Sequence, residues 1–467
     1  MGCIKSKPRS TVSPTKVHKV DPPPIIAKNF IRQNTARFTT VYKLGNVIGA
    51  GAYADVRRCE HRVTGTVRAV KIYDKAIIKA AGEEAKLLHE FKILKTLDHP
   101  HIVRLYEVFE EPELYYIVME YCRGGELFSL IQAQKKLTED KASLIMNQIL
   151  AVVSYIHEHS IVHRDLKPEN IFLEHKSGEL SVKIGDFGLA DFLGSTGTLA
   201  GIHGTSYYMA PEIFDREYNA SVDLWSCGVI LYIMLSGKVP FPGNNDEAII
   251  ERVKQLEYTF ELPEFEDVSA EAKELIQKLL CPAPIRITAK EALHHRWFKQ
   301  AMTEAPTSEM MNTVISNLRS FKKGFRIRDA LKTFIATQLT TSKEAMVLQE
   351  VFRALDTDAD GKISKSELAS ELSKTMEIPS SEEEAENIIT QVANDSYINY
   401  TEFLRAGLSQ DTLLSRRNIE MAFNMIDEDN SGKISAVELK AVLSHGKDMG
   451  LDVWEDLIAE ADRNRDG

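Results

Sequence analysis

The 467-residue chain has no apolar run long enough to span a bilayer, because charged residues interrupt every hydrophobic stretch. It also lacks the basic start and apolar segment of a secretory signal. Only five cysteines are present, and their spacing fits neither a disulfide framework nor a metal-binding cluster. These absences favour a cytoplasmic protein, and an apolar content of 43% is sufficient for about two to four globular domains.

Positive charge is scarce towards the carboxyl end of the chain. Residues 344–467 carry 27 acidic and 12 basic side chains, a balance of −15, whereas the whole chain carries −11. Apolar residues recur regularly through this acidic part, which disfavours disorder and favours a cation-binding domain. We expect a monomer that has no nucleic-acid partner.

The first ten residues, MGCIKSKPRS, carry a lipidation pattern. Gly2 follows the initiator Met, and Ser6 occupies the hydroxyl position of the N-myristoylation signal. One myristoyl chain binds a bilayer weakly, so stable anchoring needs a second acyl chain, for which Cys3 is suited, or a basic patch. We expect residues 1–41 to be a flexible tether to the inner face of a cell membrane. The alternative is an accidental pattern on a solvated tail.

Regular structure is predicted to begin near Tyr42, first as strands and later as helices. The segment GAGAYA at 49–54 resembles a phosphate-covering glycine-rich loop, although Ala54 replaces its third glycine. The strand AVK at 69–71 and Glu90 on the following helix resemble a lysine and carboxylate pair that holds nucleotide phosphates. Three further signatures follow in order, HRDLKPEN at 163–170, DFG at 186–188 and APE at 210–212.

Residues 42–298 therefore resemble a complete eukaryotic protein kinase domain. The resemblance implies an α+β bilobal protein kinase fold, with a small β-rich lobe and a large helical lobe, that uses ATP and Mg²⁺. The form DLKPEN and the threonine of GTSYY resemble kinases that phosphorylate Ser and Thr. The catalytic residues that it implies are Asp165 for the substrate hydroxyl, Lys167 for the γ-phosphate, Asn170, Lys71 and Thr205, with Asp186 and Asn170 as Mg²⁺ ligands.

The same resemblance implies a nucleotide pocket, in which Met119 guards the back and Glu120 and Cys122 meet adenine through backbone groups. Plain core packing is the alternative for Met119. Glu126 resembles the acid with which some kinases bind an Arg before the target residue, although a solvated Glu is the alternative. Arg164 is suited to pair with a phosphate on Ser195, Thr196 or Thr198. The implied pocket residues are Ile48, Gly49, Ala50, Gly51, Val56, Ala69, Lys71, Glu90, Met119, Glu120, Cys122, Glu126 and Asp186.

The acidic part contains two complete EF-hand loops, at 356–367 and 427–438. Calcium prefers many hard oxygen ligands, a glycine permits the sharp turn at position six, and a glutamate at position twelve supplies two oxygens. The predicted calcium positions are Asp356, Asp358, Asp360, Lys362 and Glu367 in the first loop, and Asp427, Asp429, Ser431, Lys433 and Glu438 in the other.

The two loops begin 71 residues apart, which leaves room for a hand between them. That hand falls at 391–402, where Gln391, Ala393 and Ser396 replace two ligands and the turn glycine. We expect a structural partner that binds calcium weakly or not at all. We assign hands one and two to 341–407 and hands three and four to 408–467, an all-α EF-hand domain. The fourth loop shows only its first ligand positions, Asp462, Asn464 and Asp466.

A basic amphipathic segment lies between the kinase and the hands, within 299–340. Residues 317–332 hold six basic side chains and one acid, with Leu318, Phe321 and Phe325 on one predicted helical stripe. Such helices are typical of calmodulin targets or membrane surfaces. An ordinary surface helix on the kinase is the alternative.

The order of tether, kinase, basic helix and EF-hands resembles the calcium-dependent protein kinases of plants and protists. The resemblance implies that the segment 299–340 occludes the active site until the chain's own EF-hands bind Ca²⁺. It implies protein substrates with Ser or Thr near basic residues. A membrane-bound sensor with an inert kinase fold, and a kinase controlled by separate calmodulin, are the alternatives.

Overall fold

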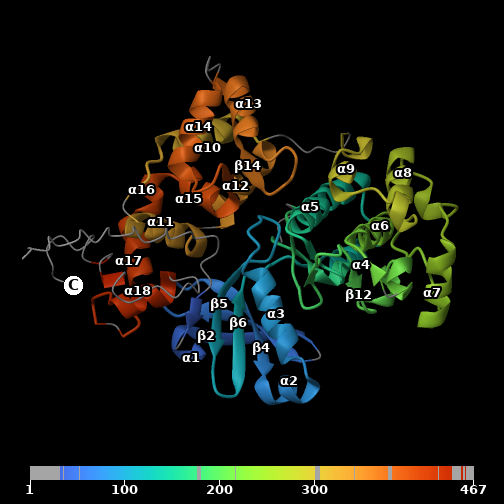
Figure 1. Cartoon of the computed structure of the whole chain (residues 1–467), viewed down its shortest axis with the longest axis horizontal. Coiled ribbons are helices and arrows are strands. Elements are labelled where there is room, and N and C mark those ends of the chain that lie inside the picture. Colours follow the sequence, from blue (N-terminus) through green and yellow to red (C-terminus); the bar gives the residue numbers. More distant parts are fainter. Residues whose placement is uncertain are drawn as a thin grey trace, which may run out of the picture.

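The computed structural model describes residues 32–34, 36–51, 53–175, 180–215, 217–299, 306–324, 326–340, 342–376, 381–429 and 431–443, with Trp454, Glu455 and Ile458. They form a β-rich lobe, a helical lobe and an EF-hand body (Figure 1). None of the described helices has the length and apolar character needed to cross a membrane. The lipidation residues Gly2 and Cys3 and the fourth-loop residues Asp462, Asn464 and Asp466 lie outside the described residues.

The small lobe is a six-stranded sheet in the order β1-β5-β6-β4-β3-β2, with helices α2 and α3. Alternate residues of its central strand β6 enter two different apolar clusters, Tyr115 and Ile117 in one and Tyr116 and Val118 in the other, so both faces of the sheet are covered there. The elements are β1 (Arg32–Asn34), β2 (Tyr42–Ala50), β3 (Ala54–His61), β4 (Val67–Asp74), α2 (Lys75–Ala81), α3 (Glu84–Leu94), β5 (Leu105–Glu110) and β6 (Leu114–Met119).

The last part of the predicted tether is folded onto this lobe. Strand β1 pairs in parallel with β5, and helix α1 (Phe38–Val41) follows it. Phe38 is fully buried and stacks on Tyr42 and Tyr116, with ring centroids 5.3 and 4.4 Å apart. The prediction of a flexible tether to residue 41 is therefore wrong for residues 32–34 and 36–41, because an open sheet edge and an aromatic pocket bind them.

The large lobe is built around helix α6 (Ser221–Ser236), which is buried along almost its whole length. A helix that is apolar on every face forms a core rather than a surface. The other elements are β7 (Gly125–Glu126), α4 (Leu127–Gln134), α5 (Glu139–Glu158), β8 (Ile161–Val162), β9 (Ile171–Leu173), β10 (Val182–Ile184), β11 (Asp191–Phe192), β12 (Leu199–Ala200), β13 (Glu217–Tyr218), α7 (Asp246–Gln255), α8 (Ala270–Leu279) and α9 (Ala289–Leu293), with six short 3₁₀ turns between Pro168 and Lys299.

The predicted junction helix is two helices, α10 (Ser308–Ser320) and α11 (Arg326–Gln338). The chain leaves α10 at Phe321, whose backbone is extended, and the Gly324 N–H donates to Asp329 Oδ2 at 2.9 Å. Phe321 is buried beneath the cationic ends of Lys332 and Arg405. The prediction of a single junction helix is wrong, because the helical backbone ends at Ser320 and a second helix begins at Arg326.

The EF-hand body follows as paired hands. Loops one and two are joined by strands β14 and β15, in which Ile363 faces Ile398. Leu348, Phe352 and Phe403 contribute to the shared core. The elements are α12 (Ser342–Leu355), β14 (Lys362–Ser364), α13 (Lys365–Met376), α14 (Ser381–Val392), β15 (Tyr397–Asn399), α15 (Tyr400–Gly407), α16 (Gln410–Leu413), α17 (Arg416–Ile426) and α18 (Ala436–Leu443).

The EF-hand body contacts both kinase lobes, and α11 lies between it and the small lobe (Figure 1). Arg68 of β4 donates to the carbonyl and side-chain oxygens of Gln338 at 3.3 and 2.9 Å. Thr401 donates its N–H and hydroxyl to Asp98, both at 2.9 Å. Helix α18 packs against β1. The hands are therefore fastened to the kinase at several separate points.

Candidate active site and calcium loops

A lysine and two carboxylates meet where the two lobes face each other. Lys71, on β4, places Nζ 3.8 Å from Glu90 Oε1 of α3 and 3.4 Å from Asp186 Oδ1 of the large lobe. Glu90 is buried, and Lys71 and Asp186 retain partial exposure. The three predicted residues thus come together from three elements, in a geometry that leaves the ammonium group open to phosphate oxygens.

Lys71 and Asp186 hold each other in ionised form, whereas burial raises the pKa of Glu90. Burial by itself would lower the pKa of Lys71, but the nearby Glu90 and Asp186 carboxylates raise it above its usual value. Burial would raise the pKa of Asp186, yet Lys71 and His163 keep it below the usual range. Asp186 therefore stays a carboxylate near neutral pH, as a Mg²⁺ ligand must be.

The catalytic loop forms a second cluster. Asp165 Oδ2 lies 2.7 Å from Lys167 Nζ, and its Oδ1 accepts the Thr205 hydroxyl at 2.9 Å. Lys167 also donates to Thr205 Oγ1 at 3.0 Å, and Asn170 Nδ2 donates to the Asp165 backbone oxygen at 2.8 Å. Asp165 is thus fixed from both sides, which is the positioning that in-line phosphoryl transfer requires.

The backbone of this loop is held in an unusual conformation by Asp223 of α6. Arg164 has φ of +67°, a region that non-glycine residues rarely adopt. The fully buried Asp223 accepts the N–H groups of His163 and Arg164, both at 2.9 Å, and contacts His157 Nε2 at 2.9 Å. These contacts offset the strain, so Asp223 supports the catalytic loop without touching substrate.

Arg164 already has a carboxylate partner. Its Nη2 lies 3.2 Å from Asp191 Oδ2, and the other Asp191 oxygen lies 3.1 Å from His89 Nε2 on α3. Asp191 therefore connects the catalytic loop to the helix that carries Glu90. No sequence signature pointed to this residue, because its role depends on which elements meet in space. A phosphate on Ser195, Thr196 or Thr198 is not needed to give Arg164 a negatively charged neighbour.

Several residues predicted for the nucleotide pocket pair with one another across the strands of the small lobe. Ala69 pairs with Met119 across β4 and β6, and Gly49 pairs with Val56 across the turn of the glycine-rich loop. Close by, Ile48, Ala50 and Gly51 are exposed, and Cys122 is partly buried. The Glu120 carboxylate points elsewhere and pairs with Lys183 at 3.0 Å, which leaves only its backbone for a nucleotide.

Two acids lie beside the substrate side of the cleft. Burial, and secondarily the charge of Glu169, raise the pKa of Glu126. Glu126 stands at the start of α4 and Glu169 in the catalytic loop. Such a pair is suited to a guanidinium or ammonium group, because a cation relieves the repulsion between them.

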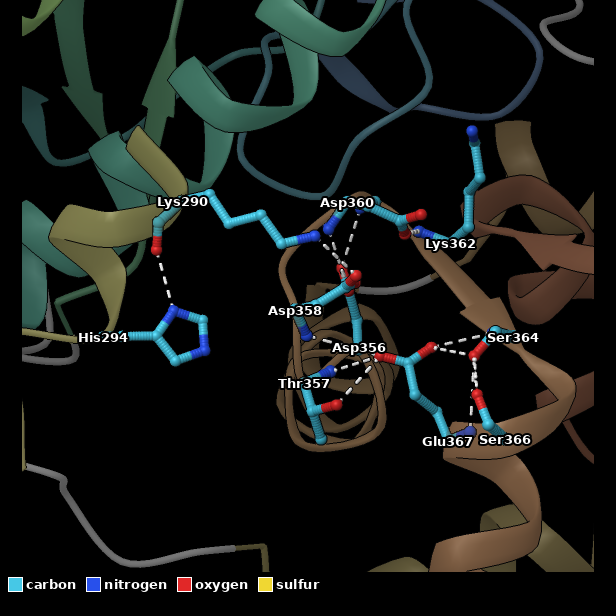
Figure 2. Close-up of polar contacts among 11 residues, drawn as sticks. Lys290, His294, Asp356, Thr357, Asp358, Asp360, Lys362, Ser364, Ser366 and Glu367 are labelled. Carbon is cyan, nitrogen blue, oxygen red and sulfur yellow. Dashed lines mark hydrogen bonds and ion pairs between the residues drawn. The ribbon is translucent and has the colours of Figure 1, made fainter. Parts of the chain in front are cut away.

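The first EF-hand loop brings three of its predicted carboxylate ligands together, whereas Asp360 is not part of that group (Figure 2). Carboxylate oxygens of Asp356, Asp358 and Glu367 lie within 4.8 Å of one another. Asp356 also accepts the Gly361 N–H at 3.0 Å, and Gly361 has φ of +78°, the turn for which position six needs a glycine. Lys362 contributes a backbone position in strand β14.

The acidic crowding in this loop is unfavourable without a cation. Burial, reinforced by Asp360 and Glu367, raises the pKa of Asp356 to about 8, and burial with Asp358 raises that of Asp360 to about 6. A divalent cation removes this repulsion while all oxygens stay ionised. The residues present therefore fit calcium.

The 427–438 loop has the same construction, whereas the middle loop does not. Oxygens of Asp427, Asp429 and Glu438 also lie within 4.8 Å of one another, and Gly432 has φ of +79°. Ser431 donates its hydroxyl to the Lys433 oxygen at 3.2 Å. Within the described ranges, those two loops are the only such clusters. In the middle loop, Glu402 likewise accepts backbone N–H groups of its own loop, but no such cluster of carboxylate oxygens is found there among the described residues.

Comparisons with known proteins agree with this construction. Residues 42–298 match the protein kinase domain, 345–406 an EF-hand domain pair and 418–450 an EF-hand domain. The chain is 36% identical over 458 residues to calcium-dependent protein kinase 4 of Plasmodium berghei and to that of Plasmodium falciparum, covering 94% of this chain and 86% of each relative. It is 35% identical over 453 residues to calcium-dependent protein kinase 3 of Plasmodium berghei, covering 94% of this chain and 80% of the relative.

Proposed function

The chain belongs to the calcium-dependent protein kinases, and we propose that its segment 299–340 keeps the kinase inactive until the EF-hands take that segment up. The family and the site make it a Ser/Thr protein kinase under calcium control. The observation that supports the finer proposal is the burial of the junction: Leu318, Phe334 and Ile335 are at most 3% exposed within the EF-hand core.

The chemistry of phosphoryl transfer rests on positioning and charge. Lys71, fixed by Glu90, is placed to hold the α- and β-phosphates of ATP, and Asp165 to orient the hydroxyl of the acceptor Ser or Thr. Lys167 and Thr205 lie beside Asp165, on the side of the cleft where the acceptor hydroxyl would bind. Mg²⁺, for which Asp186 and Asn170 are the available ligands, supplies neutralisation of the phosphate oxygens.

The side chains of the junction are suited both to the EF-hand core and to the acceptor groove of the kinase. Its apolar side chains pack in the EF-hand core, and its basic residues resemble what the acidic pair Glu126 and Glu169 would bind in a substrate. We propose that residues 317–332 occupy the acceptor groove of the inhibited kinase, and that protein substrates carry basic residues near the target. Calcium binding supplies the free energy that favours the EF-hand-bound arrangement.

The test uses the junction as a separate peptide. A synthetic peptide of residues 317–332 should inhibit the calcium-saturated full chain, raising the apparent KM for a peptide substrate and leaving the KM for ATP unchanged. A scrambled peptide of the same composition is the control, because it keeps the charge and loses the helical stripe. Inhibition by both peptides alike, or competition with ATP, would contradict the proposal, as would equal activity of the full chain in chelator and in calcium.

We also propose that acylation at Gly2 and Cys3 holds the protein at the inner face of a cell membrane. The support is the sequence pattern, since two acyl chains bind far more strongly than one. Replacing Gly2 with Ala should move most of the protein from the membrane fraction of cells to the soluble fraction, with unchanged kinase activity. Cys3→Ala should give an intermediate distribution. Retention of the Gly2→Ala protein on membranes would exclude the myristoyl anchor.

A further inference from the structure

We propose that the first calcium site is not made by the EF-hand alone: Lys290, on α9 of the kinase large lobe, belongs to it and lowers its calcium affinity. The inference deepens the calcium control proposed above and assigns a role to a kinase residue that no EF-hand or kinase signature contains. It concerns the affinity of the site, so its test differs from a test of autoinhibition.

The geometry brings a kinase cation onto a calcium ligand. Lys290 Nζ lies 3.0 Å from Asp358 Oδ2, and Asp358 occupies position three of the loop (Figure 2). Both side chains are about half exposed, at 53% and 43%. A capping box between Thr288 and Glu291 fixes the start of α9, and so places Lys290. The hydrogen bond from Lys290 therefore occupies a carboxylate oxygen of Asp358, a predicted calcium ligand.

The loop cannot easily move away from this lysine, because its turn is docked on the kinase. A Cβ added at Gly361 would lie 2.4 Å from Tyr155 Cδ2 and 3.3 Å from His99 Cδ2. Glycine at this position therefore allows both the left-handed turn and the close approach to α5. The buried contact between Thr401 and Asp98 fastens the paired second hand beside it.

Electrostatics give the direction of the effect. An ammonium group beside the loop repels an incoming divalent cation and competes with it for the Asp358 carboxylate. The charged groups around Lys290 are Asp358, Asp360 and Glu158, which lies at the end of α5. Glu158 gives the ammonium group an alternative partner once Asp358 has turned to the metal. Calcium affinity and the Lys290 contact therefore oppose each other, and by linkage each weakens the other equally.

The experiment measures calcium binding rather than activity. In the full chain with Glu438→Gln, which weakens calcium binding at the other complete loop, calcium binding to the first loop is titrated by calorimetry. Lys290→Met should tighten it by about two- to fivefold, the range expected for one half-exposed ion pair. Lys290→Arg, which keeps the charge, should bind as the parent does. Lys254→Met is the matched control: it removes a similarly exposed lysine on α7, on the far side of the large lobe (Figure 1).

The outcomes separate this inference from the proposed function. Unchanged or weaker calcium binding in Lys290→Met would overturn the inference. An equal gain in calcium affinity in Lys254→Met would also overturn it, because it would show that only the net charge of the protein matters. The gain should shrink as salt increases, because the pair is open to solvent. If Lys290→Met raises the calcium affinity as expected while kinase activity does not depend on calcium, the autoinhibition proposal is wrong and the Lys290 assignment stands. If activation is intact and the affinity does not move, only the Lys290 assignment fails.

Discussion

Replacing Asp165 with Asn is expected to lower kcat for peptide phosphorylation by about 10²- to 10⁴-fold, the usual contribution of a positioned acid-base group. Asn keeps the shape and its contact with Thr205 but cannot accept the substrate hydroxyl proton as a carboxylate does. The KM for ATP should change little, because Lys71 and Asp186 are untouched. Steady-state kinetics at saturating calcium give both values.

The matched control is Asp140→Asn, which makes the same chemical change at an exposed position near the start of α5. It should retain the parent kcat. Calcium binding to both complete loops should be the same in the two variants, since neither residue contacts the EF-hand body by any hydrogen bond described above. An Asp165→Asn protein with nearly full kcat would show that the cluster with Lys167 and Thr205 is structural, and would favour an inert or differently arranged site.

Replacing Glu367 and Glu438 together with Gln is expected to leave the kinase at its chelator-level activity at calcium concentrations that fully activate the parent. Each glutamate occupies position twelve of its loop, where an EF-hand glutamate supplies two oxygens to calcium, so its loss should weaken binding there by at least about tenfold. Each also accepts N–H groups of its own loop, which Gln can still do through one oxygen. Activity against free calcium, beside calorimetric binding, is the measurement.

Glu402→Gln offers the control at the same position of the middle loop. That loop has no cluster of carboxylate oxygens among the described residues, so this variant should keep the calcium response of the parent. The parent, the double variant and Glu402→Gln should have the same basal activity in chelator, because these residues lie outside the kinase site. A double variant that still responds fully to calcium would break the connection between the EF-hands and the catalytic cleft.

Several features were determined by the sequence alone, because their geometry is local. A twelve-residue loop with acids at fixed positions and a glycine at the turn folds its own ligands together, as Asp356 and Gly361 show. Asp165 and Asn170, which the sequence predicts as catalytic residues, likewise share one short loop. The pairing of Lys71 with Glu90 is less local, and was accessible only through resemblance to other kinases.

Other features were decided only by the tertiary structure. The basic segment forms two helices, with the buried Phe321 between them. Strand β1, which lies in the predicted tether, pairs with the edge strand β5. The contacts of Lys290 with Asp358 and of Asp98 with Thr401 join residues 68 and 303 positions apart. Such contacts depend on how the surfaces of the kinase and the EF-hand body fit together. The spacing of residues along the chain does not predict them.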